Sequence, residues 1–184
     1  MTVLVAYATA HGSTKQVAAR IGERLREGGL DADVRAADDV DDLSAYDAMV
    51  LGSAIHNGRW LTSASALLEQ IGEHPARPLR LFSVCTVGET TSFLGPRSSR
   101  LARRHRELPP DVARSGGPHR YFAGVIEKWH WNRLGGLFFL VTGGRYGDHR
   151  DWADIERWAD AIAADLTTKR ADHEGRETGS DDVR

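Results

Sequence analysis

The chain has 184 residues, of which 41% are hydrophobic, and its formal net charge is −2. That length suits one domain with a hydrophobic core of ordinary size, and the near-neutral charge argues against a nucleic-acid partner. A single cysteine excludes a disulfide framework within the chain, and the absence of a signal-peptide pattern after Met1 predicts a cytoplasmic protein.

Residues 2–16 predict a strand, a turn rich in hydroxyl groups and a helix, in that order. The turn is Thr9-Ala10-His11-Gly12-Ser13-Thr14, and it ends where apolar residues begin to recur at helical spacing. Unpaired N–H groups, the positive end of the helix dipole and three hydroxyls would therefore meet at one point, which suits a phosphate. The turn lacks the Gly-Lys-Ser/Thr ending of a triphosphate loop and the three glycines of a dinucleotide turn, which leaves a lone phosphomonoester. The alternative is a Ser/Thr-rich helix cap that binds nothing.

The pattern Thr9-x-x-Gly12-x-Thr14 after a first strand resembles the FMN phosphate loop of flavodoxins. The resemblance implies that FMN is the cofactor and that residues 9–14 hold its phosphate.

Strand and helix patterns alternate along the rest of the chain. Residues 30–36 alternate between apolar and polar, which is typical of an edge strand, whereas residues 48–53 are apolar throughout, as in a strand buried on both faces. The other expected elements are a helix over 61–71, strands over 79–85 and 121–126, and a last helix over 152–166. This alternation predicts an α/β fold of the flavodoxin-like kind: a doubly wound, five-stranded parallel sheet of order 2-1-3-4-5 with helices on both faces.

Two more loops should meet the turn 9–14 at the carboxyl edge of this sheet, where ligands of such folds bind. Ser53-Ala54-Ile55-His56-Asn57-Gly58 follows the third strand and would border one side of a flavin ring. Thr86-Val87-Gly88-Glu89 follows the fourth strand and would border the pyrimidine edge. A glycine in each loop permits close approach of the main chain.

Three side chains near this edge have two interpretations each. His56 is either a catalytic proton relay or a surface histidine without a role. Trp60 either stacks on the ring or anchors the core, and Cys85 is either a small buried hydrophobe or a thiol beside the flavin. The histidines are scattered without ligand-like spacing, so we expect no metal site.

Two segments and the C-terminus add features beyond the sheet. A helix over 98–108, ended by Pro109-Pro110, is rich in arginine and is either a solvated basic face or a patch for acidic partners, anionic lipids or carboxylated substrates. The insert 127–144 carries two tryptophans and an apolar run too short to span a bilayer. It is either a satellite core or homodimer contact, or else a substrate wall or a peripheral membrane contact. The domain should cover residues 1–166, and 167–184 reads as a disordered tail.

With this insert the chain resembles the flavodoxin-type, menaquinone-dependent protoporphyrinogen dehydrogenases and their flavodoxin-domain relatives. The matching stretches are Ser53–Gly58, Phe82–Val84, Ala123-Gly124, Trp131, Thr142–Gly144 and Asp151-Trp152. The departures are an insert that is shorter than in those enzymes and Asn57, which stands where an aromatic residue is common. The resemblance implies an FMN-dependent oxidoreductase that oxidises a small or porphyrin-like molecule and passes electrons to a quinone.

Two other classes of protein compete with this one. The first is a flavodoxin that carries electrons between redox proteins, although the modest net charge and the apolar insert count against it. The second is a receiver domain, which needs an acidic pocket and a phosphorylatable aspartate where this chain has Tyr7-Ala8-Thr9 and Ser53.

Overall fold

The computed structural model describes residues 1–73, 77–85, 100, 107–126 and 145–178. Three sequence predictions lie outside these ranges: the loop Thr86–Glu89, most of the basic helix 98–108 and the insert 127–144. Within the described residues, none of the helices combines the length and the apolar composition needed to cross a bilayer.

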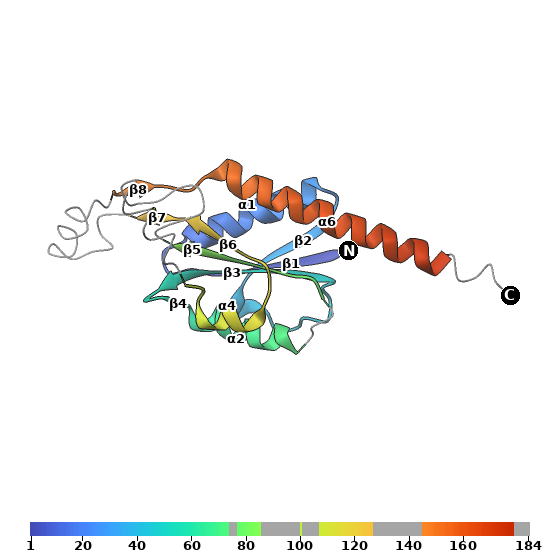
Figure 1. Ribbon diagram of the computed structural model, residues 1–184, viewed down its shortest axis with the longest axis horizontal. Helices are drawn as coiled ribbons and strands as arrows, with labels where there is room; N and C mark the ends of the chain where they lie inside the picture. The colour runs from blue at the N-terminus through green and yellow to red at the C-terminus, as the bar shows by residue number, and fades with distance from the viewer. Residues whose placement is uncertain (74–76, 86–99, 101–106, 127–144, 179–184) are drawn as a thin grey trace.

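Five parallel strands run through the centre of the molecule (Figure 1). They lie in the order β2-β1-β3-β5-β6, which confirms the predicted order 2-1-3-4-5, because β5 and β6 are the fourth and fifth parallel strands along the chain. A further short strand, β4 (Arg59–Trp60), pairs antiparallel with the end of β3. The parallel strands are β1 (Thr2–Ala8), β2 (Asp31–Ala36), β3 (Ala48–His56), β5 (Leu79–Cys85) and β6 (His119–Ala123).

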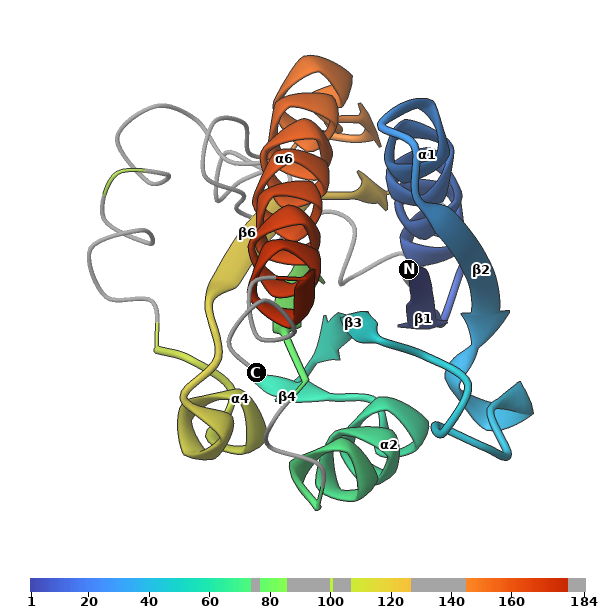
Figure 2. The same ribbon diagram turned by 90° about the vertical axis from the view of Figure 1, so that its right-hand side faces the viewer.

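Helices cover both faces of the sheet (Figure 2). α1 (Ser13–Glu27) and α6 (Trp152–Thr178) lie on one face, and α2 (Thr62–Gly72) and α4 (Pro110–Ser115) lie on the other. A short 3₁₀ helix, η1 (Ala37–Asp39), follows β2. Successive side chains of a strand point to opposite faces, so Val5 joins the core cluster beneath α1 and α6, whereas Leu4 joins the cluster beneath α2.

One short helix was not predicted, and one boundary differs from the sequence prediction. α4 begins at Pro110, because the first helical position does not need the N–H that proline lacks, whereas the helix expected before Pro109 lies mostly outside the described residues. The strand expected over 121–126 ends at Ala123 as β6. After Gly124 the chain continues as β7 (Val125–Ile126), which pairs antiparallel with β8 (Gly147–Asp148).

The last helix is longer than predicted. It was expected to end at Leu166 before a disordered tail, but α6 continues to Thr178 and passes beyond the edge of the sheet (Figure 1). The prediction relied on apolar content alone, which falls after Leu166. Local bonds support the extension: the Thr167 hydroxyl donates to the Ala163 carbonyl at 2.8 Å, and Lys169 pairs with Asp165 at 3.0 Å.

Candidate functional site

The predicted phosphate turn joins β1 to α1 at the carboxyl edge of the sheet. Gly12 adopts φ 87°, a left-handed conformation that glycine accepts without strain, and its N–H donates to Thr9 Oγ1 at 2.9 Å. α1 begins at Ser13, and its first helical hydrogen bond runs from Gln16 N to Gly12 O at 3.2 Å. The N–H groups of residues 13–15 therefore have no partner within the helix and lie at the positive end of its dipole.

Thr14 is the side chain in this turn that points to a ligand. It is 0% exposed, yet its Oγ1 has no hydrogen-bond partner among the described residues. An unsatisfied buried hydroxyl costs about 1–3 kcal/mol, so an acceptor oxygen placed against it would be stabilising. The first turn of α1 contains no acidic side chain that would repel an anion. The residues present thus fit a phosphate group.

The second predicted loop is a tight β-hairpin between β3 and β4. Ile55 pairs with Trp60 and His56 with Arg59, so that only Asn57 and Gly58 form the turn. Both turn residues have positive φ, 51° and 75°, which is the pattern of a type I′ turn. Asparagine tolerates this conformation better than an aromatic residue does, which explains why Asn57 departs from the family pattern. The tip from His56 to Arg59 is exposed.

Buried side chains hold this hairpin on the sheet. Trp60 is 5% exposed, and its Nε1 donates to Ser83 Oγ on β5 at 2.7 Å. Ser83 Oγ also lies 2.8 Å from His119 Nε2 on β6. At the other side of the hairpin, Leu61 N donates to Ser53 Oγ at 3.0 Å. Of its two interpretations, Trp60 is therefore the core anchor, and it is not free to stack on a ring.

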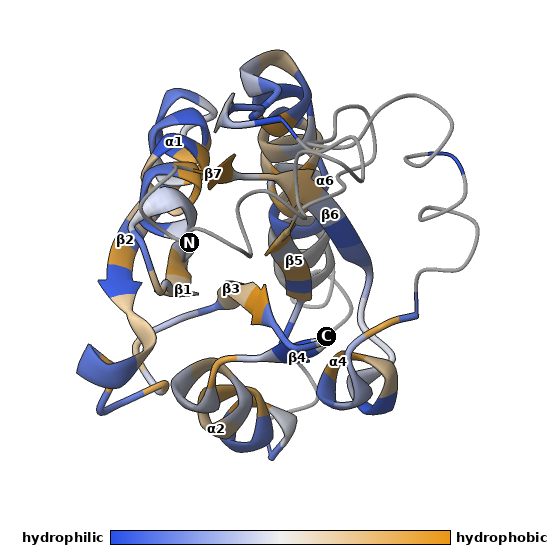
Figure 3. Cartoon of the chain, turned by 90° about the vertical axis from the view of Figure 1, so that its left-hand side faces the viewer, coloured by the Kyte–Doolittle hydropathy of each residue, from blue (hydrophilic) through white to orange (hydrophobic). Residues whose placement is uncertain are grey.

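The sheet brings these two loops to the same edge. Ala8, the last residue of β1, pairs with Ser53, and β3 continues from there to the hairpin. β5 ends at Cys85, a half-buried residue at the same edge, and the third predicted loop follows it outside the described residues. Figure 3 looks onto the side of the molecule where β4 and β7 lie. Residues 9–14 and 53–58 therefore follow neighbouring strands at the same edge of the sheet.

Sequence reasoning missed Arg150, which lies beside the phosphate turn. Its Nε and Nη2 donate to the two carboxylate oxygens of Asp148 at 2.8 and 2.6 Å, and its Nη1 donates to Gln16 Oε1 on α1. The guanidinium stacks over the Trp152 ring, 4.4 Å from its centroid. The Arg150 hydrogen bonds hold the pKa of the Asp148 carboxyl below its usual value. The sequence signal for this cluster was an acid, an arginine and an aromatic residue at alternate positions, Asp148, Arg150 and Trp152.

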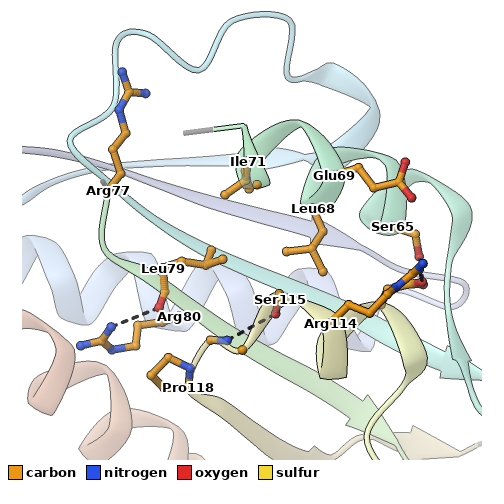
Figure 4. Close-up of a pocket in the computed structure, with 14 residues that line it drawn as sticks. Ser65, Leu68, Glu69, Ile71, Arg77, Leu79, Arg80, Arg114, Ser115 and Pro118 are labelled. Carbon is orange, nitrogen blue, oxygen red and sulfur yellow. Dashed lines mark hydrogen bonds and ion pairs between the residues drawn. The ribbon is translucent and has the colours of Figure 1, made fainter. Parts of the chain in front are cut away.

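A cavity of about 550 Å³ lies elsewhere, between α2 and α4 (Figure 4). Leu68 and Leu79 form apolar parts of its wall, and Arg114 and Ser65 both hydrogen-bond Asp111 at its rim. Leu79 begins β5, whereas the predicted flavin loop follows the opposite end of that strand. None of the residues predicted for the functional site lines this cavity.

Known proteins resemble this chain in sequence and in fold. Residues 4–121 match the family described as the flavodoxin domain. The protoporphyrinogen IX dehydrogenase (quinone) of Escherichia coli strain K12 is 25% identical over 178 residues, which cover 89% of this chain and 95% of that protein.

Two solved structures share the fold at low sequence identity. A flavodoxin from the domain Archaea superposes with a TM-score of 0.57 at 15% identity, over 91% of this chain and 99% of that one. The rubredoxin oxygen:oxidoreductase of Desulfovibrio gigas superposes with a TM-score of 0.59 at 17% identity. That match covers 92% of this chain but only 37% of the larger protein.

Proposed function

This chain belongs to the flavodoxin-domain family, and we propose that it is a flavin-binding oxidoreductase whose cofactor is FMN. The observation that carries the proposal is the buried Thr14 hydroxyl, which has no hydrogen-bond partner in the described part of the chain, beside the N–H groups of residues 13–15, which have no partner within α1. A phosphomonoester needs one such cluster of donors. A pyrophosphate is bound instead by a turn with three glycines, which this chain lacks.

The described residues divide the work of binding between two loops. The hydroxyls and main-chain N–H groups of Thr9, Ala10, His11, Gly12, Ser13 and Thr14 would hold the phosphate. The hairpin residues Ser53, Ala54, Ile55, His56, Asn57 and Gly58 would border the ring, because they lie at the same edge one strand away. The family resemblance assigns the pyrimidine edge to Thr86, Val87, Gly88 and Glu89.

Bound FMN would supply transfer of one electron or of a hydride. The protein has to orient the ring, exclude water and control protons. We assign His56 the role of proton relay, because it is exposed on the loop that would border the ring in the proposed binding mode. The type I′ turn at Asn57-Gly58 sets the position of the His56 main chain.

The substrate and the electron acceptor come from the similarity to the Escherichia coli enzyme, whose name gives protoporphyrinogen IX and a quinone. We extend both to this chain as a proposal: a porphyrinogen-like or other small organic molecule is oxidised, and a quinone is reduced. The flavodoxin electron carrier is the second candidate, because the solved flavodoxin matches over 91% of this chain and 99% of its own length.

Two measurements test these statements in sequence. Purified protein should be yellow, and denaturation should release a flavin that chromatography and mass spectrometry identify as FMN. Release of FAD, or no flavin after incubation of the apoprotein with FMN, would contradict the cofactor assignment. Steady-state turnover of a porphyrinogen with a quinone then separates the enzyme from the carrier, which would exchange electrons only with redox proteins.

A further inference from the structure

The antiparallel pair β7–β8 and the phosphate turn line a shared open cavity of about 390 Å³. Its lining comes from the turn and the first residues of α1 on one side, and from the β7–β8 pair and Arg150 on the other: His11, Ser13, Gln16, Val125, Gly147, Asp148 and Arg150. The two sides are in close contact. A Cβ atom added at Gly124, just before β7, would lie 3.3 Å from Ser13 Oγ and 2.7 Å from Val84 Cγ1.

Arg150 is the charged group that this arrangement buries. Its side chain is only 9% exposed, and Asp148 and Gln16 take three of its five N–H donors. Hydrogen bonds to described side chains leave two N–H donors on this nearly buried guanidinium, which lines the cavity. Buried donors of this kind are normally paired, which favours an anionic acceptor in the cavity.

Asp148, the carboxylate partner of Arg150, also lines this cavity. The Asp148 side chain is 45% exposed, so water screens it, whereas the guanidinium is not screened in this way. The turn 9–14 itself contains no lysine or arginine, and Lys15 is exposed. A phosphate bound there would otherwise meet only main-chain dipoles and hydroxyls.

We propose that Arg150 is part of the phosphate site and supplies the positive charge that the turn lacks, while its bonds to Asp148 and Gln16 fix the β7–β8 pair as the outer wall of that site. The inference rests on the proposed function and deepens it, because it assigns a second element, after β6, to the binding of the phosphate. The ligand class is a phosphomonoester dianion.

The test compares FMN with riboflavin, which has the same ring but no phosphate. Dissociation constants of both are measured by flavin fluorescence on the full-length apoprotein. In Arg150→Met the constant for FMN should rise about 10-fold or more, as expected for loss of a charge-assisted hydrogen bond, while that for riboflavin is unchanged. Arg150→Lys keeps the positive charge but loses the paired N–H donors of the guanidinium, so its dissociation constant for FMN should lie between those of the wild type and Arg150→Met.

Arg24→Met is the matched control. Arg24 also binds a carboxylate with two donors, to Asp160 at 2.9 Å each, and also joins α1 to the C-terminal part of the chain, but at the far end of α1. The Arg24→Met variant should leave the ratio of the FMN and riboflavin dissociation constants unchanged. An unchanged ratio in Arg150→Met, or an equal loss of both ligands, would refute the role of Arg150 in phosphate binding.

A flavin-free measurement separates this inference from the proposed function. Inorganic phosphate should raise the melting temperature of the wild-type apoprotein and not that of Arg150→Met, a difference that does not depend on the flavin. If the wild type binds no FMN but shows this difference, the cofactor assignment fails and the anion site stands. If phosphate stabilises both proteins equally, Arg150 lies outside the site.

Discussion

At the scale of single residues, the Thr14 hydroxyl should lower the stability of the apoprotein and strengthen FMN binding. Its buried hydroxyl has no partner among the described residues, so Thr14→Val should raise the free energy of unfolding of the apoprotein by about 1 kcal/mol. The same change removes a donor to the phosphate and should weaken FMN binding about 10-fold, which is roughly 1.4 kcal/mol. Urea denaturation of the apoprotein and FMN titration measure the two effects.

Two further variants at this position sharpen the result. Thr14→Ser keeps the hydroxyl and should retain FMN affinity close to the wild type. Thr14→Glu places a negative charge where the α1 amides favour an anion, and it should abolish binding. FMN bound by Thr14→Glu with wild-type affinity would show that the phosphate lies elsewhere.

Residues differ in how far the sequence could assign them. Gly12 was predicted correctly as part of a turn before a helix, because strand, turn and helix patterns follow one another without interruption, whereas Thr14, which was expected in the turn, lies in the first turn of α1. Trp60 could not be decided, because its partner Ser83 lies on another strand. Arg150 was missed because its contact with Gln16 joins residues that are remote in the sequence.

At the scale of elements, two side-chain hydrogen bonds, from Trp60 to Ser83 and between Ser83 and His119, join the β3–β4 hairpin to β5 and β6. Ser83→Ala leaves the buried Trp60 N–H without its acceptor and should lower the free energy of unfolding by about 1–3 kcal/mol. Trp60→Phe should lower the free energy of unfolding less in the Ser83→Ala background than in the wild type, because Ser83→Ala has already removed the hydrogen bond between these two side chains. Urea unfolding of the four proteins in this double-mutant cycle measures the coupling, and strict additivity would contradict it.

The elements themselves were predicted best where the hydrophobic period was long. The five parallel strands and their order followed from alternation in 30–36 and continuous apolar character in 48–53. The β3–β4 hairpin was not predicted, although Asn57-Gly58 is the strongest short signal for one, because the stretch was interpreted only as a loop after a strand. The β7–β8 pair was not predicted, because its two strands are separated in the sequence by residues 127–146.

At the scale of the whole molecule, several carboxylates should make folding sensitive to acid. Hydrogen bonds from Ser65 and then Arg114 lower the pKa of Asp111, and Tyr46 and Arg35 do the same for Asp33. A carboxylate whose pKa is lower in the folded state stabilises the fold above its unfolded pKa, near pH 4, and loses that contribution as the pH falls through the folded pKa. The urea midpoint should therefore decline below about pH 4. Asp111→Asn should lower the midpoint at pH 7 and flatten this decline, and an equally steep decline in the variant would contradict the assignment.

The insert 127–144 is the part of the chain where we expect function beyond that of an electron carrier. A short Gly/Ser link in place of residues 129–141 should leave FMN bound, because loops 9–14 and 53–58 are elsewhere and the pairing of Ile126 with Gly147 can hold the link.

The same replacement should remove turnover with a quinone or a porphyrinogen. The insert carries Trp129, Trp131, Phe138 and Phe139 in a connection that the parallel sheet does not require, and aromatic side chains kept there need a protein, a membrane or a ligand to cover them. The insert follows β7, whose Val125 lines a cavity together with the phosphate turn, and we therefore propose that it forms a substrate wall. Wild-type turnover in the shortened protein would assign the insert to packing or to a homodimer contact. Loss of FMN together with loss of the folded state would assign it to the core.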